Sequence, residues 1–124
     1  MTEKLILEKI DNIAKITINN PSANTWDLES LAGLEEIIEH LNQDDEIFSL
    51  VITGQGEKFF SAGADLKVFR EGGKDAAKEM SNAFSRAFDS LSKFRGVSIA
   101  AINGFAMGGG LECALACDIS VAEE

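Results

Sequence analysis

The chain has 124 residues, 45% of them hydrophobic, and a formal net charge of −10. This length allows one domain with a modest core, and the composition is ordinary for a globular protein. The negative charge argues against nucleic acids and anionic membranes as partners, because both need a basic face, and no apolar run is long enough to span a bilayer.

The first predicted elements are two strands, at residues 5–10 and 13–18. Asp11-Asn12 lies between them and predicts a tight hairpin. A polar loop follows, and then a helix at residues 28–41. Its apolar residues recur at the spacing of a helix face packed on a sheet, at Leu31, Leu34, Ile37, Ile38 and Leu41.

The remaining predicted elements alternate between strand and helix. They cover residues 50–53 (strand), 75–92 (helix), 98–102 (strand), 111–117 (helix) and 119–122 (strand). The longer helix carries one apolar stripe, formed by Met80, Phe84, Phe88 and Leu91, and we expect an exposed apolar face on this helix to favour self-association of the chain. Gly72-Gly73, just before the longer helix, is typical of a helix terminator, with a mobile lid as the other interpretation. The repeated β-α-β order predicts a largely parallel sheet with right-handed crossovers.

Two glycine-rich loops follow buried strands and share one design. The first runs from Gly54 to Gly63 and leads into Ala64-Asp65-Leu66. The second runs from Gly104 to Gly110 and leads into Leu111-Glu112. Backbone N–H groups at a strand-to-helix crossing lack intrahelical partners and favour negative charge. Both loops would leave the carboxyl edge of a parallel sheet, so two of their N–H groups could converge as an oxyanion hole.

Other motifs with similar residues do not match. Gly54-Gln55-Gly56 lacks the third glycine of a dinucleotide fingerprint, and Gly73-Lys74-Asp75 lacks the hydroxyl residue and glycine spacing of a P-loop. Phe59 occupies the place of the first glycine that a nucleophile elbow at Ser61 would need, and His40 is distant in sequence. These features argue against a nucleotide-binding fold of either type and against a serine hydrolase.

The cysteines predict packing rather than metal binding. Cys113 and Cys117 are four residues apart on an apolar helix, and the chain has one histidine. A zinc site would have too few ligands, so we expect both thiols to be buried and reduced, with no metal site.

Four segments, in this order along the chain, carry a resemblance to a known family. They are Ile16-Thr17-Ile18-Asn19-Asn20-Pro21 with Asn24 beyond it, Phe60-Ser61-Ala62-Gly63-Ala64-Asp65-Leu66, Asn103-Gly104-Phe105-Ala106-Met107-Gly108-Gly109-Gly110, and Leu111-Glu112 followed by Ala116-Cys117-Asp118. The chain resembles the first part of a crotonase, the enoyl-CoA hydratase/isomerase family. Crotonase chains are usually considerably longer. The resemblance therefore implies that residues 1–124 are the amino-terminal part of a single catalytic core, without the carboxy-terminal trimerisation helices.

The resemblance also implies a fold and an activity. The fold is an α/β spiral of stacked ββα turns, which strand order alone does not separate from a doubly wound sheet. The activity is hydration of a 2-enoyl-CoA to a 3-hydroxyacyl-CoA, with an enolate of the thioester stabilised in an oxyanion hole. The alternatives are an enoyl-CoA isomerase, a hydroxyacyl-CoA dehydratase, a thioester hydrolase, or an inactive CoA-binding fragment or scaffold.

By the same resemblance, the N–H groups of Ala64 and Gly109 would hold the thioester oxygen, and Glu112 would be one of two catalytic glutamates. The second glutamate would lie beyond Glu124. The substrate-binding positions would be Ala62, Asp65, Leu66, Lys67, Gly108 and Trp26. Considered from the residues alone, Asp65 and Asp118 are at positions that favour capping, and a single tryptophan is often a core residue.

Glu112 has two interpretations from its sequence context. An acidic residue in the first turn of a helix complements the helix dipole without any catalytic role. Its neighbours are mainly apolar, at Met107, Leu111, Cys113, Ala114 and Leu115. They predict a desolvated wall that would raise the carboxyl pKa towards the value that a proton shuttle needs.

The remaining predictions concern the cofactor, the phosphate-binding residues, the location and the oligomeric state. Coenzyme A is anionic and is part of the substrate, so no separate cofactor is expected. Lys58, Lys67 and Arg70 flank the first glycine loop and could bind its phosphates, or they could be solvated surface charges. The charged start at Met1-Thr2-Glu3-Lys4 lacks the pattern of a signal peptide, which predicts a cytoplasmic location, with the mitochondrial matrix as the alternative. The resemblance implies a homotrimer or hexamer at full length.

Overall fold

The computed structural model of the chain describes residues 2–122. Its elements, in chain order, are β1 (Leu5–Ile10), β2 (Ile13–Ile18), α1 (Leu28–Asn42), β3 (Ser49–Gly54), β4 (Phe59–Ser61), α2 (Leu66–Ser92), β5 (Val97–Ile102), β6 (Phe105–Ala106), α3 (Gly109–Ala116) and β7 (Ile119–Ala122). No helix in this part of the chain is both long and apolar enough to cross a bilayer.

The main sheet has five strands in the order β1-β2-β3-β5-β7. β1 and β2 are antiparallel and form the predicted hairpin, with Asp11 at a positive φ of 54° in its turn. All other neighbours in this sheet pair in parallel, which confirms the largely parallel sheet. The carboxyl ends of the parallel strands therefore lie along one edge.

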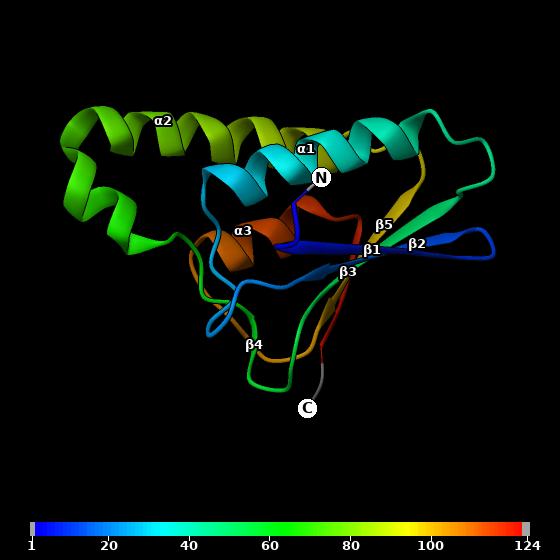
Figure 1. The fold of residues 1–124 in the computed structure, drawn as a ribbon. Helices are drawn as coiled ribbons and strands as arrows, with labels where there is room; N and C mark the ends of the chain where they lie inside the picture. Colours follow the sequence, from blue (N-terminus) through cyan, green and yellow to red (C-terminus); the bar gives the residue numbers. More distant parts are fainter. Residues whose placement is uncertain (1, 123–124) are drawn as a thin grey trace.

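A second, small sheet was not predicted. It consists of β4 and β6, which pair in parallel and arise from the two glycine-rich loops. Helices α1 and α2 lie side by side above the main sheet, and α3 lies below α2 (Figure 1). A doubly wound sheet carries helices on both faces. The two sheets and the one-sided helices fit the crotonase-type spiral expected from the resemblance.

The helices bury the faces that the apolar spacing predicted, with one difference at α2. Helix α1 packs its predicted apolar stripe into the core. Helix α2 begins at Leu66 rather than near residue 75, and its break at Gly73 (φ 65°) joins two helical segments instead of starting the helix. Met80, Phe88 and Leu91 are buried against the rest of the fold. The prediction of an exposed apolar face on this helix is therefore wrong.

Candidate functional site

The two glycine-rich loops are in backbone contact. The Met107 N–H donates to the Ser61 carbonyl oxygen at 3.0 Å. A Cβ atom on Gly63 would lie 3.1 Å from the Gly109 nitrogen, and one on Gly110 would overlap the Ser61 carbonyl oxygen. Side chains at these two glycines would push the loops apart, so the glycines permit the close approach.

Each loop carries an N–H group that donates no hydrogen bond within residues 2–122. The Trp26 N–H donates to the Gly63 carbonyl at 2.7 Å and the Asp65 N–H donates to the Trp26 carbonyl at 2.9 Å, so the Ala64 N–H between them points away from this bridge. Gly109 is the first residue of α3, where an N–H has no partner within the helix. Within residues 2–122, neither N–H donates a hydrogen bond.

A pocket of about 420 Å³ brings the predicted catalytic residues together. Its lining residues are Ala64, Ala77, Ser81, Phe84, Ser85, Phe88, Gly109 and Glu112. Ala64, Gly109 and Glu112 therefore border one cavity, although they come from two loops and a helix. The opposite wall comes from α2 and was not predicted. The sequence signal that could have indicated this wall is the pair Ser81 and Ser85, which lie four residues apart beside the apolar stripe of the helix.

Glu112 lies in the first turn of α3, and its N–H donates to the Gly108 carbonyl at 3.0 Å. Its side chain is exposed, and so are three of the five apolar neighbours that were expected to cover it, with Leu115 73%, Met107 49% and Leu111 46% exposed. The prediction of a desolvated wall is wrong for the part of the chain that the structure describes. The side chains of Glu112, Leu111 and Leu115 point outward because this short helix places them on the side away from the core.

The other predicted substrate-binding residues lie around the pocket rather than in its lining. The Ala62 N–H donates to the Ala23 carbonyl at 2.9 Å, and Leu66 is exposed at the start of α2. The carboxylate of Asp65 accepts from the Lys67 N–H at 3.1 Å, which confirms the capping interpretation of Asp65. Gly108, with a φ of 53°, precedes α3 at the pocket edge.

The three cations near the first loop do not meet in the pocket. Lys58 lies with its ammonium 5.6 Å from the centroid of the Phe59 ring and lines a separate groove near Phe105. Lys67 and Arg70 are exposed on the first turns of α2. Their binding of CoA phosphates stays a prediction.

Trp26 lies behind the pocket rather than in it. Its side chain is 0% exposed, which favours the core interpretation. Its ring packs edge-on against Phe88 at 5.7 Å, and Phe88 packs against Phe84 at 5.4 Å. This aromatic row connects the core to the pocket wall, so Trp26 supports the site through Phe88 and through its backbone bridge to Ala64.

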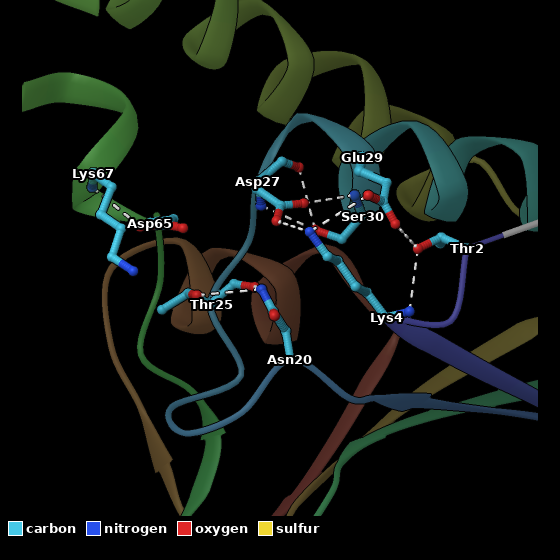
Figure 2. A network of polar contacts seen from close by, with 9 residues as sticks. All are labelled: Thr2, Lys4, Asn20, Thr25, Asp27, Glu29, Ser30, Asp65 and Lys67. Carbon is cyan, nitrogen blue, oxygen red and sulfur yellow. Dashed lines mark hydrogen bonds and ion pairs between the residues drawn. The ribbon is translucent and has the colours of Figure 1, made fainter. Parts of the chain in front are cut away.

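The segment before α1, which carries Trp26, is fastened by a polar network (Figure 2). Asp27 caps α1 by accepting from the Ser30 N–H at 2.8 Å, and its other oxygen lies 2.5 Å from the Lys4 ammonium. Lys4 also approaches Glu29, which accepts a hydrogen bond from the Thr2 hydroxyl. Burial raises the pKa of Asp27, but the bonds from Lys4 and Ser30 outweigh it and leave that pKa below its ordinary value.

This network predicts a specific loss of stability in acid. Because Asp27 has a lowered pKa in the folded state, its contribution is fully present above the unfolded value of about 3.9 and disappears as the pH falls through the folded pKa. Asp27→Asn keeps a cap acceptor but removes the charge. We expect it to lower the free energy of unfolding at pH 7 by about 1 kcal/mol.

Urea unfolding of both proteins across a pH series measures this effect. The gap between wild type and Asp27→Asn should close in acid, once the wild-type carboxylate is protonated. The exposed Glu29 offers a control, because Glu29→Gln should change stability by less than about 0.5 kcal/mol. A gap that stays constant with pH would contradict the prediction.

Both cysteines are free thiols, Cys113 buried and Cys117 half-buried. Burial raises the pKa of Cys113 well above its ordinary value, and burial likewise raises the pKa of Cys117 to about 11. Thiols with such pKa values are poor nucleophiles and poor metal ligands near neutral pH. In residues 2–122, no group of three His, Cys, Asp or Glu side chains could hold a metal ion.

The fold and the site define the class of protein: an α/β spiral with two backbone donors and a carboxylate at one pocket. The family described as Enoyl-CoA hydratase/isomerase matches residues 8–124, and the chain belongs to this family.

Several curated relatives are similar over nearly the whole chain. The short-chain-enoyl-CoA hydratase of Clostridium acetobutylicum is 37% identical over 119 residues, which are 95% of this chain and 46% of the relative. The carnitinyl-CoA dehydratase of Salmonella enteritidis is 40% identical over 124 residues, which are 100% of this chain and 47% of the relative. The chain thus spans about half the length of these relatives.

Solved structures agree with this assignment. Pseudomonas aeruginosa DspI is 66% identical with a TM-score of 0.96, covering 98% of this chain and 50% of the DspI chain. An enoyl-CoA hydratase from Bacillus anthracis is 31% identical with a TM-score of 0.94, covering 97% of this chain and 47% of that protein. These scores confirm the crotonase fold.

Proposed function

We propose that residues 1–124 supply the oxyanion-hole part of an acyl-CoA site, and that the whole gene product adds water to a 2-enoyl-CoA. The observation that carries this proposal is the meeting of three groups at one pocket. Within residues 2–122 the N–H groups of Ala64 and Gly109 donate no hydrogen bond, and Glu112 lines the same pocket. Two preorganised donors suit an oxygen on which negative charge develops.

The proposed chemistry follows from these groups. The thioester carbonyl oxygen accepts hydrogen bonds from the Ala64 and Gly109 N–H groups, which makes the β-carbon electrophilic. Water adds to the β-carbon, and the electron pair of the double bond moves through the α-carbon onto the carbonyl oxygen as an enolate. The enolate then takes a proton at the α-carbon, and the product is a 3-hydroxyacyl-CoA. Glu112 orients the water and accepts one of its protons as the bond to the β-carbon forms, and its carboxyl group then returns a proton to the α-carbon.

One product analysis separates this reaction from its alternatives. Crotonyl-CoA incubated with the whole gene product should lose the absorbance of its conjugated thioester and gain the mass of one water. An isomerase given a 3-enoyl-CoA would move its double bond without changing its mass. A thioester hydrolase would release free CoA thiol from crotonyl-CoA. The second candidate is a dehydratase, which the likeness to the carnitinyl-CoA dehydratase supports. Such an enzyme would convert a 3-hydroxyacyl-CoA faster than it hydrates an enoyl-CoA.

A binding measurement separates the enzyme from an inert fragment or scaffold. Acetyl-CoA at 100 times its dissociation constant should stabilise the protein by about 2.7 kcal/mol, visible as a higher melting temperature. A shift without turnover would support a CoA-binding scaffold, and the absence of any shift would contradict an acyl-CoA site. Light scattering of the same sample tests the proposed trimer or hexamer.

A further inference from the structure

The backbone pairing of β3 with β5 ends before these two strands lead into the glycine-rich loops. Backbone pairing between β3 and β5 extends to Ile52 and Ala100. Beyond this pair the strands diverge, and side chains bridge them. The Thr53 hydroxyl donates to the Ala101 carbonyl at 2.8 Å. The Asn103 amide then pairs with the backbone of Gly54 at both ends, accepting from its N–H at 3.0 Å and donating to its carbonyl at 2.9 Å.

A second amide, that of Asn24, contacts the same loop. Asn24 is buried with a positive φ of 52°, a conformation that asparagine tolerates better than most residues. Its amide nitrogen donates to the carbonyls of Gln55 and Phe59, both at 3.0 Å. The Asn103 amide nitrogen also donates to the Gly56 carbonyl at 2.8 Å, and it lies 3.3 Å from the Phe59 carbonyl, which shares one of its two hydrogens. Asn24 and Asn103, here called the amide clamp, therefore converge on Phe59.

The amide clamp contacts the first glycine-rich loop upstream of its donor, and Asn103 directly precedes the second loop. Phe59 begins β4, which ends at Ser61, three residues before the Ala64 donor. Asn103 lies two residues before β6, which leads into the loop that ends at Gly109. Phe59 of β4 pairs with the first residue of β6. A shift of the Phe59 carbonyl would disturb this pairing and so change the position of one donor relative to the other.

We propose that Asn24 and Asn103 are positioning residues that set the spacing of the two oxyanion donors, an inference that rests on the proposed function. Each side chain donates and accepts at once, since the Asn24 oxygen also accepts from the Asn20 N–H at 3.2 Å, and an amide supplies both roles. An aspartate of the same shape keeps the acceptor but loses both N–H donors, and it places negative charge against backbone carbonyls. Asn103→Asp should therefore loosen the loops without changing any group in the pocket.

The test uses a probe whose colour reports on the oxyanion hole. In 4-(dimethylamino)cinnamoyl-CoA, light moves charge from the amine to the thioester oxygen, so hydrogen bonds to that oxygen shift the absorption to longer wavelength. With the whole gene product, the wild type should shift the bound probe to the red. Asn103→Asp should bind the probe and lose most of the shift. Its kcat for crotonyl-CoA should fall about 10²-fold while KM changes less than about threefold.

The matched control is Asn12→Asp, at the other end of the sheet. Asn12 also donates its amide to a backbone carbonyl, that of Glu46 at 2.7 Å, so the chemical change is the same. It should keep the full red shift and the wild-type kcat. All measurements are made well below the melting temperature of each variant, so that only folded protein is compared. A purely structural role of Asn103 would lower stability but leave the spectrum of the bound probe unchanged.

The outcomes separate the inference from the function on which it rests. A folded Asn103→Asp that keeps the full shift and kcat would overturn the amide clamp and leave the proposed function intact. A wild type that binds the probe without any red shift would overturn both. If Asn103→Asp does not fold, Asn24→Asp is measured instead, because it also removes a donor to the Phe59 carbonyl, and the same two results decide.

Discussion

Glu112→Gln should lower the turnover of crotonyl-CoA by the whole gene product by about 10²- to 10⁴-fold, the usual contribution of a positioned general acid or base. The amide has the same shape as the carboxylate but cannot accept the proton of an attacking water. Glu112 borders the pocket together with both proposed donors, so the loss should be in kcat. KM should change little, because Glu112 is not needed to hold the CoA portion of the substrate.

The control for this experiment is Glu79→Gln, which makes the same substitution at an exposed position on α2 outside the pocket lining. It should leave kcat at the wild-type value. The red shift of the bound cinnamoyl probe should survive in Glu112→Gln, since the oxyanion donors are untouched. Turnover that does not differ between Glu112→Gln and wild type would remove Glu112 from the mechanism.

The sequence identified the elements whose periodicity is strong. The hairpin of β1 and β2 and the helix α1 have alternating or helical apolar patterns, and the structure places them within a residue or two of the predicted bounds. The strands β4 and β6 have three residues and two residues, too short for any period to be visible. Their pairing depends on the approach of two distant loops, which no local pattern records.

The site was only partly visible in the sequence for a related reason. Glycine-rich loops and an acidic first turn mark the donors and Glu112, and the structure brings these residues to one pocket. Phe84 was predicted as part of an apolar helix stripe and not as part of a pocket wall, because the helical spacing is the same for both. The exposure of Glu112 was missed because neighbours in sequence do not cover a side chain unless the fold turns them towards it.

Asparagines in loops present the same difficulty. Asn24 and Asn103 are in segments that also suit simple turns, where asparagine is common for its local hydrogen bonds. Their contacts to the loop at residues 55–59 come from positions 31 to 47 residues away in sequence. Only the folded structure shows that the two amides meet at one carbonyl.

A pair of variants at Gly109 should isolate the contribution of one oxyanion donor. A Cβ atom on Gly109 would lie 2.6 Å from the Phe84 ring, so both variants are made together with Phe84→Leu to provide space. Gly109→Ala keeps the N–H, whereas Gly109→Pro removes it. Gly109 is the first residue of α3, the helix position at which proline is best tolerated. The proline variant should have a kcat about 10²- to 10³-fold below that of the alanine variant, equivalent to about 2.7–4 kcal/mol.

The comparison is between the two double variants, because Phe84→Leu and the added Cβ are common to both. The alanine variant should shift the cinnamoyl probe to the red, and the proline variant should shift it less, since only the Ala64 N–H remains to polarise the thioester. Binding of acetyl-CoA, followed by calorimetry, shows whether the proline ring blocks the pocket instead. Equal kcat values and equal shifts in two variants that bind acetyl-CoA alike would exclude the Gly109 N–H as an oxyanion donor. The Ala64 N–H would then be the only donor of the proposed pair at this pocket.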